Sequence, residues 1–167
     1  MSKTGFTLIE LVMVLVVLGL MAAIVIPKAF NLKGERLGKE ARHLVAFISH
    51  LSTEAAIKKK PLRLYYDLDE GRYWAIMLDA NADIFEEKPL VTPLLRKVTF
   101  PQGISFYKVA VKGKINTNRG ITYTSFTPWG YRDKTRIYLK TEKDKILTIT
   151  IPSIGERIKV YKGYVEN

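Results

Sequence analysis

The chain has 167 residues, enough for one domain of ordinary size with a hydrophobic core. It contains no cysteine, which excludes disulfide bridges, thiolate metal sites and thiol nucleophiles. Its net charge of +11 favours acidic partners such as nucleic acid, anionic lipid headgroups or an acidic protein face, although a solvated lysine-rich surface gives the same composition.

An almost unbroken apolar run occupies residues 6–26 and contains a single charge, Glu10. As a helix rising about 1.5 Å per residue, the run spans roughly 30 Å, the thickness of a bilayer's hydrocarbon core. Three interpretations are open: a secretory signal peptide, a plain membrane anchor, or a segment whose Gly5–Phe6 bond is cut. The apolar run has no clear end at which a signal peptidase could cut, which argues against a secretory signal peptide. A carboxylate in hydrocarbon costs about 2.5 kcal/mol or more, so a plain membrane anchor does not explain Glu10.

The helical period resumes after Pro27, where we expect a kink or break, and after a short irregular spacer at 31–34. Apolar residues then recur three and four positions apart, at Leu37, Ala41, Leu44, Ile48, Leu51 and Ala55. This spacing predicts an amphipathic helix of about 20 residues that ends near residues 58–61.

Beyond Pro61 the pattern becomes that of strands. β-forming runs occur at 62–68, 72–78, 104–111, 121–127, 135–141, 146–151 and 157–162, with turn residues between most of them. Residues 81–94 are expected to form a loop. One long N-terminal hydrophobic and amphipathic helix followed by an antiparallel sheet is an α+β arrangement, with the apolar face of the sheet packed on the helical stripe.

A family resemblance begins at Gly5, Phe6, Thr7, Leu8, Ile9 and Glu10. These residues and the apolar run resemble the N-terminal signal of type IV pilins and type II secretion pseudopilins, in which a prepilin peptidase cuts after the glycine and methylates the new N-terminal residue. Later segments, "FTPWGYRDKTRIYL" and "ILTITIPSIGERIKVYKG", are similar to the GspH/FimT group of minor pseudopilins and pilins. The resemblance implies a pilin-like fold: a cleaved leader at 1–5, a transmembrane assembly helix at 6–27, its amphipathic continuation at 28–60 and a β-sheet domain at 61–167.

The position of Glu10 fits this resemblance. Cleavage would create an α-amine on Phe6, the residue that the family methylates, and such an amine has a pKa of about 8. Glu10 would lie roughly 6 Å along the helix axis from that amine. In a helical bundle the carboxylate could pair with the Phe6 amine of a neighbouring subunit and set the stagger between subunits. The alternative is that Glu10 lies unpaired at the headgroup interface.

Two functions remain open. The resemblance implies a minor pseudopilin of a type II secretion system, at or near the tip of a periplasmic pseudopilus that moves substrate proteins across the outer membrane. The alternative is a FimT-like minor type IV pilin that binds DNA for natural transformation or aids pilus assembly, which the positive charge favours. The candidate DNA-binding or partner-binding residues near the C-terminus are Arg157, Lys159 and Lys162. An alternative patch consists of Lys108, Lys112, Lys114 and Arg119.

Either function implies the same location and the same classes of partner. The chain would cross the inner membrane once, with its C-terminal domain in the periplasm or outside the cell. Its partners would be the prepilin peptidase and methyltransferase, other pilins or pseudopilins, membrane lipid, and either a secreted protein substrate or DNA.

Motifs for enzymatic chemistry are absent from the sequence. There is no phosphate-binding loop, dinucleotide fingerprint, zinc-protease helix or serine-hydrolase elbow. The carboxylates at 67–70 and 79–83 lack the spacing of an EF-hand, and His43 and His50 lie too far apart for one metal. We therefore expect no catalytic residue, no metal site, no cofactor and no enzymatic activity.

Overall fold

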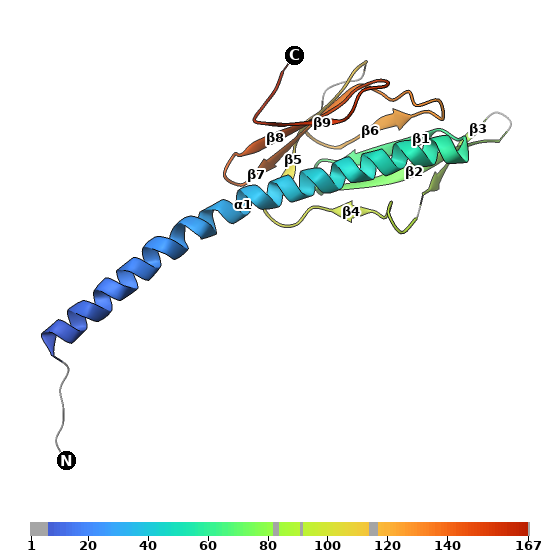
Figure 1. Cartoon of the computed structure of the whole chain (residues 1–167). Helices are drawn as coiled ribbons and strands as arrows, with labels where there is room; N and C mark the ends of the chain where they lie inside the picture. Colours follow the sequence, from blue (N-terminus) through green and yellow to red (C-terminus); the bar gives the residue numbers. More distant parts are fainter. Residues whose placement is uncertain (1–6, 82–83, 91, 114–116, 167) are drawn as a thin grey trace. The chain divides into compact units, whose positions relative to one another are not determined.

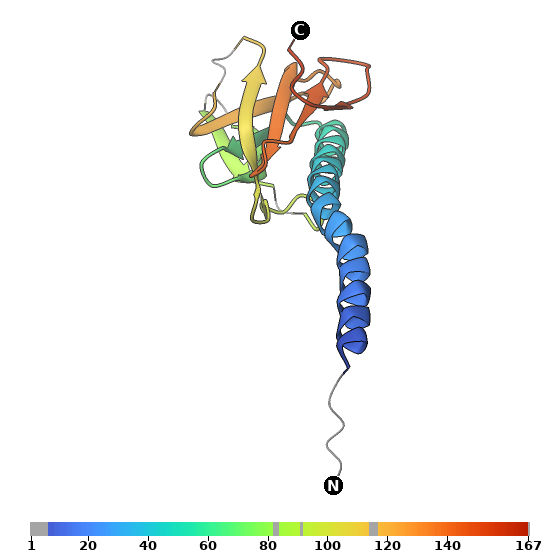
Figure 2. The ribbon, with the colours of Figure 1, turned by 90° about the vertical axis from the view of Figure 1, so that its left-hand side faces the viewer.

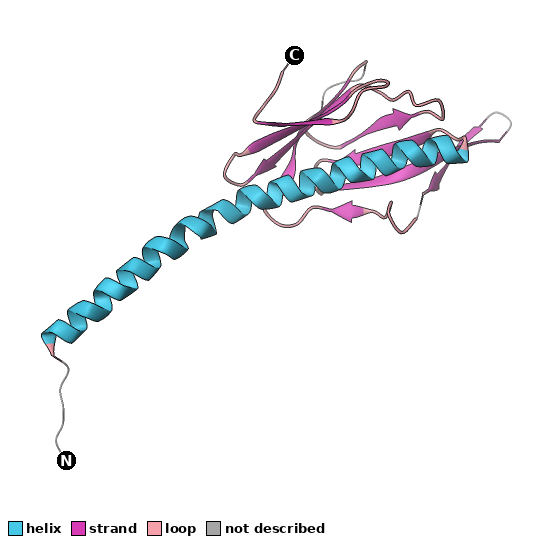
Figure 3. Ribbon diagram, viewed as in Figure 1, coloured by secondary structure: helices cyan, strands magenta, loops and turns pink. Residues whose placement is uncertain are grey.

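Helix α1 spans Leu8–Lys58 (Figures 1 and 3). The computed structural model describes residues 7–81, 84–90, 92–113 and 117–166, apart from the side chains of 22–34 and 80–87. The expected break at Pro27 and spacer at 31–34 are wrong, because the backbone is helical throughout. A proline removes one helical hydrogen bond, and helical runs on both sides can carry the helix past it. The helix ends where Lys59 takes a left-handed conformation, with φ of 54°.

The chain divides into two compact units, Met1–Arg36 and Leu37–Asn167. The described part of the first unit is the N-terminal portion of α1. The second unit contains the remainder of α1 and all the strands that the structure describes.

The first sheet is antiparallel. It consists of β1 (Leu62–Asp67), β2 (Arg72–Asn81), β3 (Ile84–Pro89), β4 (Val98–Thr99) and β6 (Ile121–Phe126). The order is β3-β2-β1-β6, and β4 also pairs with β2. The loop expected at 81–94 is therefore corrected, since β3 lies within it and pairs with β2. Pro89 concealed this strand in the sequence, but an edge strand tolerates proline because one side of its backbone needs no partner.

The second sheet is also antiparallel and has four strands. They are β5 (Ile104–Val111), β7 (Thr135–Thr141), β8 (Ile146–Ile151) and β9 (Lys159–Lys162), in the order β5-β7-β8-β9. In Figure 2, β5, β7 and β8 lie side by side. We expected a single sheet, and the structure has two.

One hydrophobic core joins the helix and both sheets. The predicted helical stripe is confirmed, because Leu37, Ala41, Leu44, Ile48, Leu51 and Ala55 are all buried. The Phe47 ring meets the Tyr73 ring of β2 at 5.0 Å, and the Tyr66 ring of β1 meets the Phe106 ring of β5 at 5.8 Å. Burying one such large apolar side chain contributes about 1.5–3 kcal/mol. The α+β class, a helix packed on antiparallel strands, is thus confirmed.

A chain of buried hydroxyl groups also connects the two sheets. The Tyr66 hydroxyl lies 3.0 Å from Thr124 Oγ1, which lies 2.9 Å from Thr135 Oγ1. Thr135 Oγ1 donates to the Asp133 carbonyl at 2.9 Å. Because each hydroxyl has one proton, Thr124 must donate to Thr135, and Tyr66 must donate to Thr124. Burial raises the pKa of Tyr66, so its phenol keeps the proton that this order requires.

Candidate functional site: the N-terminal helix and a basic sheet face

The N-terminal part of α1 is apolar on all sides. Between Leu8 and Met21 its large apolar side chains are 47–83% exposed. A helix that is hydrophobic all round requires an apolar environment, either lipid or other helices. Within the described residues, no helix is both long enough and apolar enough to cross a membrane.

Glu10 lies in the first turn of α1. Its backbone N–H and that of Leu11 donate to the Thr7 carbonyl at 3.1 and 3.2 Å. A carboxylate in the first turn of a helix interacts favourably with the helix dipole. Gly5 and Phe6 lie outside the described residues, so cleavage, methylation and the pairing of Glu10 remain predictions.

The predicted cationic residues that the structure describes lie on several different elements. Lys159 faces the outer side of the second sheet beside Thr150, whereas Lys162 lies opposite Leu147 on the other side of β9. Lys112 follows β5, and its N–H donates to the Lys134 carbonyl at 2.8 Å.

Three other candidates are Arg119, Arg157 and Lys114. Arg119 belongs to the turn next to β1, because Gly120 N–H donates to Asp69 Oδ2 at 2.9 Å. Arg157 lies in the loop before β9, and Lys114 lies outside the described residues. These cations are therefore distributed over both sheets.

Two predicted cations, Lys108 and Lys159, share the outer face of the second sheet with two that were not predicted. The strand register places Lys108 opposite Tyr138, Arg136 opposite Thr150, and Thr150 opposite Lys159. Lys140 lies on the same side of β7 as Arg136, since alternate residues of a strand share a face. We call Lys108, Arg136, Lys140 and Lys159 the basic face. Strands β5, β7, β8 and β9 contain no Asp or Glu, whereas β1 and β2 each carry one carboxylate and one arginine.

The C-terminal segment (residues 163–166) covers the centre of this outer face. Tyr138 Oη donates to the Val165 carbonyl at 3.0 Å, and Thr148 Oγ1 donates to the Gly163 carbonyl at 2.7 Å. The Tyr164 ring stacks on the Tyr138 ring with centroids 4.6 Å apart. Tyr138 and Thr148 point away from the core yet are buried, because this segment shields them. Burial also raises the pKa of Tyr138, and a hydrogen bond from Arg136 opposes the rise.

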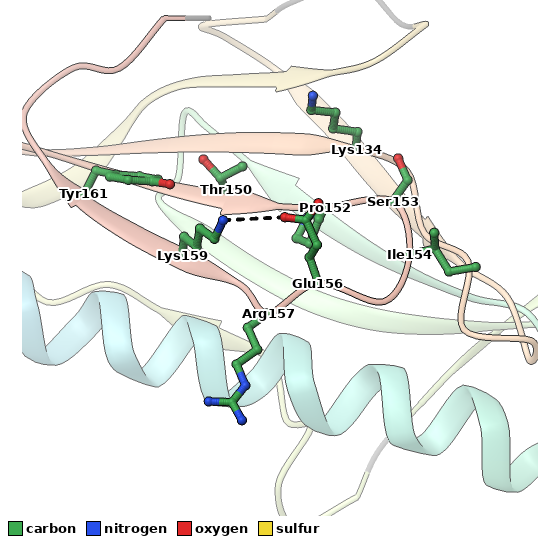
Figure 4. Close-up of a pocket in the computed structure, with 9 residues that line it drawn as sticks. All are labelled: Lys134, Thr150, Pro152, Ser153, Ile154, Glu156, Arg157, Lys159 and Tyr161. Carbon is green, nitrogen blue, oxygen red and sulfur yellow. Dashed lines mark ion pairs between the residues drawn. The ribbon is translucent and has the colours of Figure 1, made fainter.

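A shallow cavity of about 310 Å³ adjoins the basic face. It is lined by Lys134, Thr150, Pro152, Ser153, Ile154, Glu156, Arg157, Lys159 and Tyr161. Figure 4 shows Lys159 paired with Glu156, at 3.5 Å, while Arg157 is directed away from both. Because Glu156 neutralises Lys159, the cavity is a weaker anion site than its cations alone suggest.

Asp67, at the end of β1, and Asp79, within β2, have partners within the fold. Arg72 Nε donates to Asp67 Oδ2 at 2.8 Å. Lys60 and Lys88 bind the two carboxylate oxygens of Asp79 at 2.6 and 3.2 Å, and their hydrogen bonds lower its pKa. In the part of the chain that the structure describes, no three His, Cys, Asp or Glu residues are grouped as a metal site requires. These carboxylates therefore stabilise turns and strand ends.

Arg136 and Lys140 were not predicted as binding residues, although the sequence carried a signal for them. Ile137 and Leu139 are buried in the core, so Arg136 and Lys140 must face outward from the same strand. That alternation could have identified two of the four members of the basic face. Lys108 and Lys159 join them only through pairing between distant strands, which the sequence does not specify.

Comparisons with known proteins match an N-terminal motif and the fold of the domain. Residues 1–26 match the family model of the prokaryotic N-terminal methylation motif. Two solved structures of the minor pseudopilin EpsH from the type II secretion system of Vibrio cholerae resemble the fold, with TM-scores of 0.57 and 0.61 and sequence identities of 12% and 10%. Each similarity covers 76% of this chain, and 97% and 96% of the EpsH chains.

A comparison with curated protein sequences finds no match. Motif and fold together confirm the resemblance to the type IV pilin-like and pseudopilin superfamily.

Proposed function

We propose that the chain is a minor pseudopilin, a non-enzymatic subunit of a type II secretion pseudopilus. One combined observation carries the proposal: an N-terminal methylation motif precedes a domain with the fold of EpsH. The motif supports processing by a prepilin peptidase and assembly with other pilin-like subunits. The fold supports the minor class, since EpsH is a minor pseudopilin.

The N-terminal segment supplies both attachment and assembly in this proposal. Residues 6–26 anchor the chain in the inner membrane, with the β-sheet domain in the periplasm. The peptidase cuts the Gly5–Phe6 bond and Phe6 is methylated. The Glu10 carboxylate then pairs with the Phe6 amine of a neighbouring subunit, which offsets the cost of placing both charges in an apolar bundle. The exposed apolar side chains between Leu8 and Met21 are those that the bundle would bury.

A deletion strain tests this function. Without the gene, substrate proteins of the secretion system should accumulate in the periplasm and disappear from the medium. The full chain should restore secretion, and a Gly5→Ala variant that blocks cleavage should not. Undiminished secretion in the deletion strain would contradict the proposal, provided that deletion of the major pseudopilin abolishes secretion in the same assay.

The basic face favours a second candidate function, capture of DNA by a minor pilin. Strands β5, β7 and β9 carry cations, and none of the four strands of this sheet contains a carboxylate. Phosphate neutralisation by such cations drives non-specific DNA affinity. The full chain in neutral detergent is titrated with a DNA duplex at two salt concentrations. Arg136→Glu should weaken binding and reduce the salt slope by about 1 or more, whereas Lys39→Glu, an exposed cation on α1, should change neither. Absence of binding at low salt would exclude this candidate.

A further inference from the structure

An exposed tryptophan projects from the loop that follows β6. Trp129 is 85% exposed, and its ring contacts no other ring among the described residues. Tryptophan is the residue type most enriched at the centres of protein interfaces and is costly to leave in water. A single exposed apolar side chain does not by itself indicate a contact, so its surroundings decide whether Trp129 belongs to a binding site.

The backbone holds this tryptophan in a fixed position. Thr127 N–H donates to the Tyr131 carbonyl at 2.8 Å, and Gly130 N–H donates to the Thr127 carbonyl at 3.2 Å. The Thr127 hydroxyl donates to the Tyr131 carbonyl at 3.0 Å and accepts from the Tyr131 N–H at 3.1 Å. Gly130 has φ of 81°, a conformation that favours glycine and closes the turn behind Trp129. A backbone held in this way loses little conformational entropy on binding.

The tryptophan forms one wall of a cleft at the C-terminal end of α1. The cleft has a volume of about 390 Å³ and is lined by Ala56, Lys59, Pro61, Thr127, Pro128 and Trp129. Strand register explains this meeting of distant segments, because Leu62 pairs with Phe126 and so brings Pro61 beside Thr127. Figure 1 shows the loop after β6 near the end of the helix. Apart from Lys59 and the threonine, the lining is apolar.

Lys59 gives the cleft its charge. It is one of the few residues other than glycine with a positive φ, at 54°, and a side chain in that conformation carries strain. Its neighbours Lys58 and Lys60 are paired with Glu54 and Asp79. Lys59 makes no ion pair with any residue that the structure describes. The cleft therefore combines apolar walls with one cation available to a partner.

We propose that this cleft docks a partner protein through a segment that carries a bulky apolar side chain next to a carboxylate. The apolar side chain enters between Trp129 and Pro128, and the carboxylate pairs with Lys59. A concave cleft of this volume fits a side chain better than it fits the flat surface of a bilayer. The proposal rests on the proposed function only in assuming a protein partner, and its test is independent of secretion.

Trp129 itself reports binding, since the chain has two tryptophans and Trp74→Phe leaves only this one. The full chain with this change, in zwitterionic detergent, is titrated with a capped Gly-Phe-Glu-Leu-Glu-Gly peptide and with its Lys-for-Glu counterpart. The acidic peptide should shift Trp129 emission to the blue with saturation, and the basic peptide should not. If Trp74→Phe does not fold, the indole N–H resonance of Trp129 in the unaltered chain gives the same readout.

Lys59→Glu should reverse the preference between the two peptides, while Lys145→Glu, an exposed lysine of the β7–β8 hairpin, should leave it unchanged. Trp129→Ala, followed by the isotope-labelled peptide, should weaken binding at least about tenfold without altering the thermal midpoint. Equal response to both peptides, no response, or retention of the acidic preference in Lys59→Glu would overturn the proposal. A blue shift caused by phosphatidylglycerol alone, or by raising the protein concentration, would assign the cleft to lipid or to self-association instead.

Discussion

Three buried hydroxyls, those of Tyr66, Thr124 and Thr135, connect the two sheets. Removing the middle one, Thr124, should lower the free energy of unfolding more than removing the Tyr66 hydroxyl. Thr124→Val deletes two hydrogen bonds and leaves the fully buried Tyr66 hydroxyl without an acceptor. Each lost bond costs about 1 kcal/mol, and an unsatisfied buried donor adds about 1–3 kcal/mol. Tyr66→Phe deletes one bond and strands no donor, since Thr124 still donates to Thr135. We expect about 3–5 kcal/mol for Thr124→Val and about 1 kcal/mol for Tyr66→Phe.

The double variant separates these contributions. Once Tyr66 is phenylalanine, Thr124→Val no longer strands a donor, so it should cost about 1 kcal/mol instead of its larger cost in the wild type. The coupling between the two sites should therefore be about 2–4 kcal/mol, the wild-type cost of Thr124→Val minus its cost beside phenylalanine.

Urea unfolding of the full chain in detergent provides the measurement, followed by tryptophan fluorescence, because both tryptophans lie in the unit Leu37–Asn167. The slope with urea should stay constant while the midpoint moves. If Tyr66→Phe lowered the free energy of unfolding more than Thr124→Val did, the order in which Tyr66 donates to Thr124 and Thr124 to Thr135 would be wrong. Strict additivity in the double variant would show that the hydroxyls do not act as a chain.

Three further predictions concern assembly, pH and packing. Glu10→Ala should be cleaved normally yet fail to enter fibres, as a fractionation of sheared fibres would measure, and normal incorporation would refute the pairing with the neighbouring amine. Asp79 has a lowered pKa because Lys60 and Lys88 hydrogen bond its carboxylate. Its contribution to the stability of the folded state is therefore present above the unfolded pKa of about 4 and is lost as the pH falls through the lower folded pKa. The thermal midpoints of wild type and Asp79→Asn should differ at pH 6 and converge in acid, and a constant gap would contradict this linkage. Leu44→Ala should destabilise the domain by about 2–5 kcal/mol in urea unfolding, since Leu44 is 0% exposed in the core, and a loss below 1 kcal/mol would contradict its central position.

Local periodicity predicted most elements of this fold. The stripe from Leu37 to Ala55 follows the helical repeat, and each of its members is buried. Strands such as β7 and β8 were predictable because alternate residues differ in polarity and a turn at 142–145 joins them. These features depend on residues a few positions apart.

Features that depend on distant pairing could not be predicted in the same way. The division into two sheets follows from pairing of β1 with β6 and of β5 with β7, across long stretches of chain. β3 escaped prediction because its proline is compatible with a strand only at an edge.

The positions of the candidate cations also depend on how the strands pair and which way each residue faces, so they could not be predicted from the sequence alone. Lys159 and Lys162 are close in sequence, but their spacing of three places them on opposite faces of β9. The burial of Tyr138 by the C-terminal segment also requires contacts that only the folded chain provides.

The N-terminus of the mature chain tests the central claim most directly. The chain is purified from the membrane and fibre fractions of its native host, and its N-terminal peptide is identified by mass spectrometry. Processing as a pseudopilin predicts a chain that begins at Phe6 and carries a methyl group on its α-amine, with Glu10 at the fifth position of the mature protein. A chain that still begins at Met1, or one cut beyond residue 20 as a secretory signal peptide would be, would contradict the proposed function.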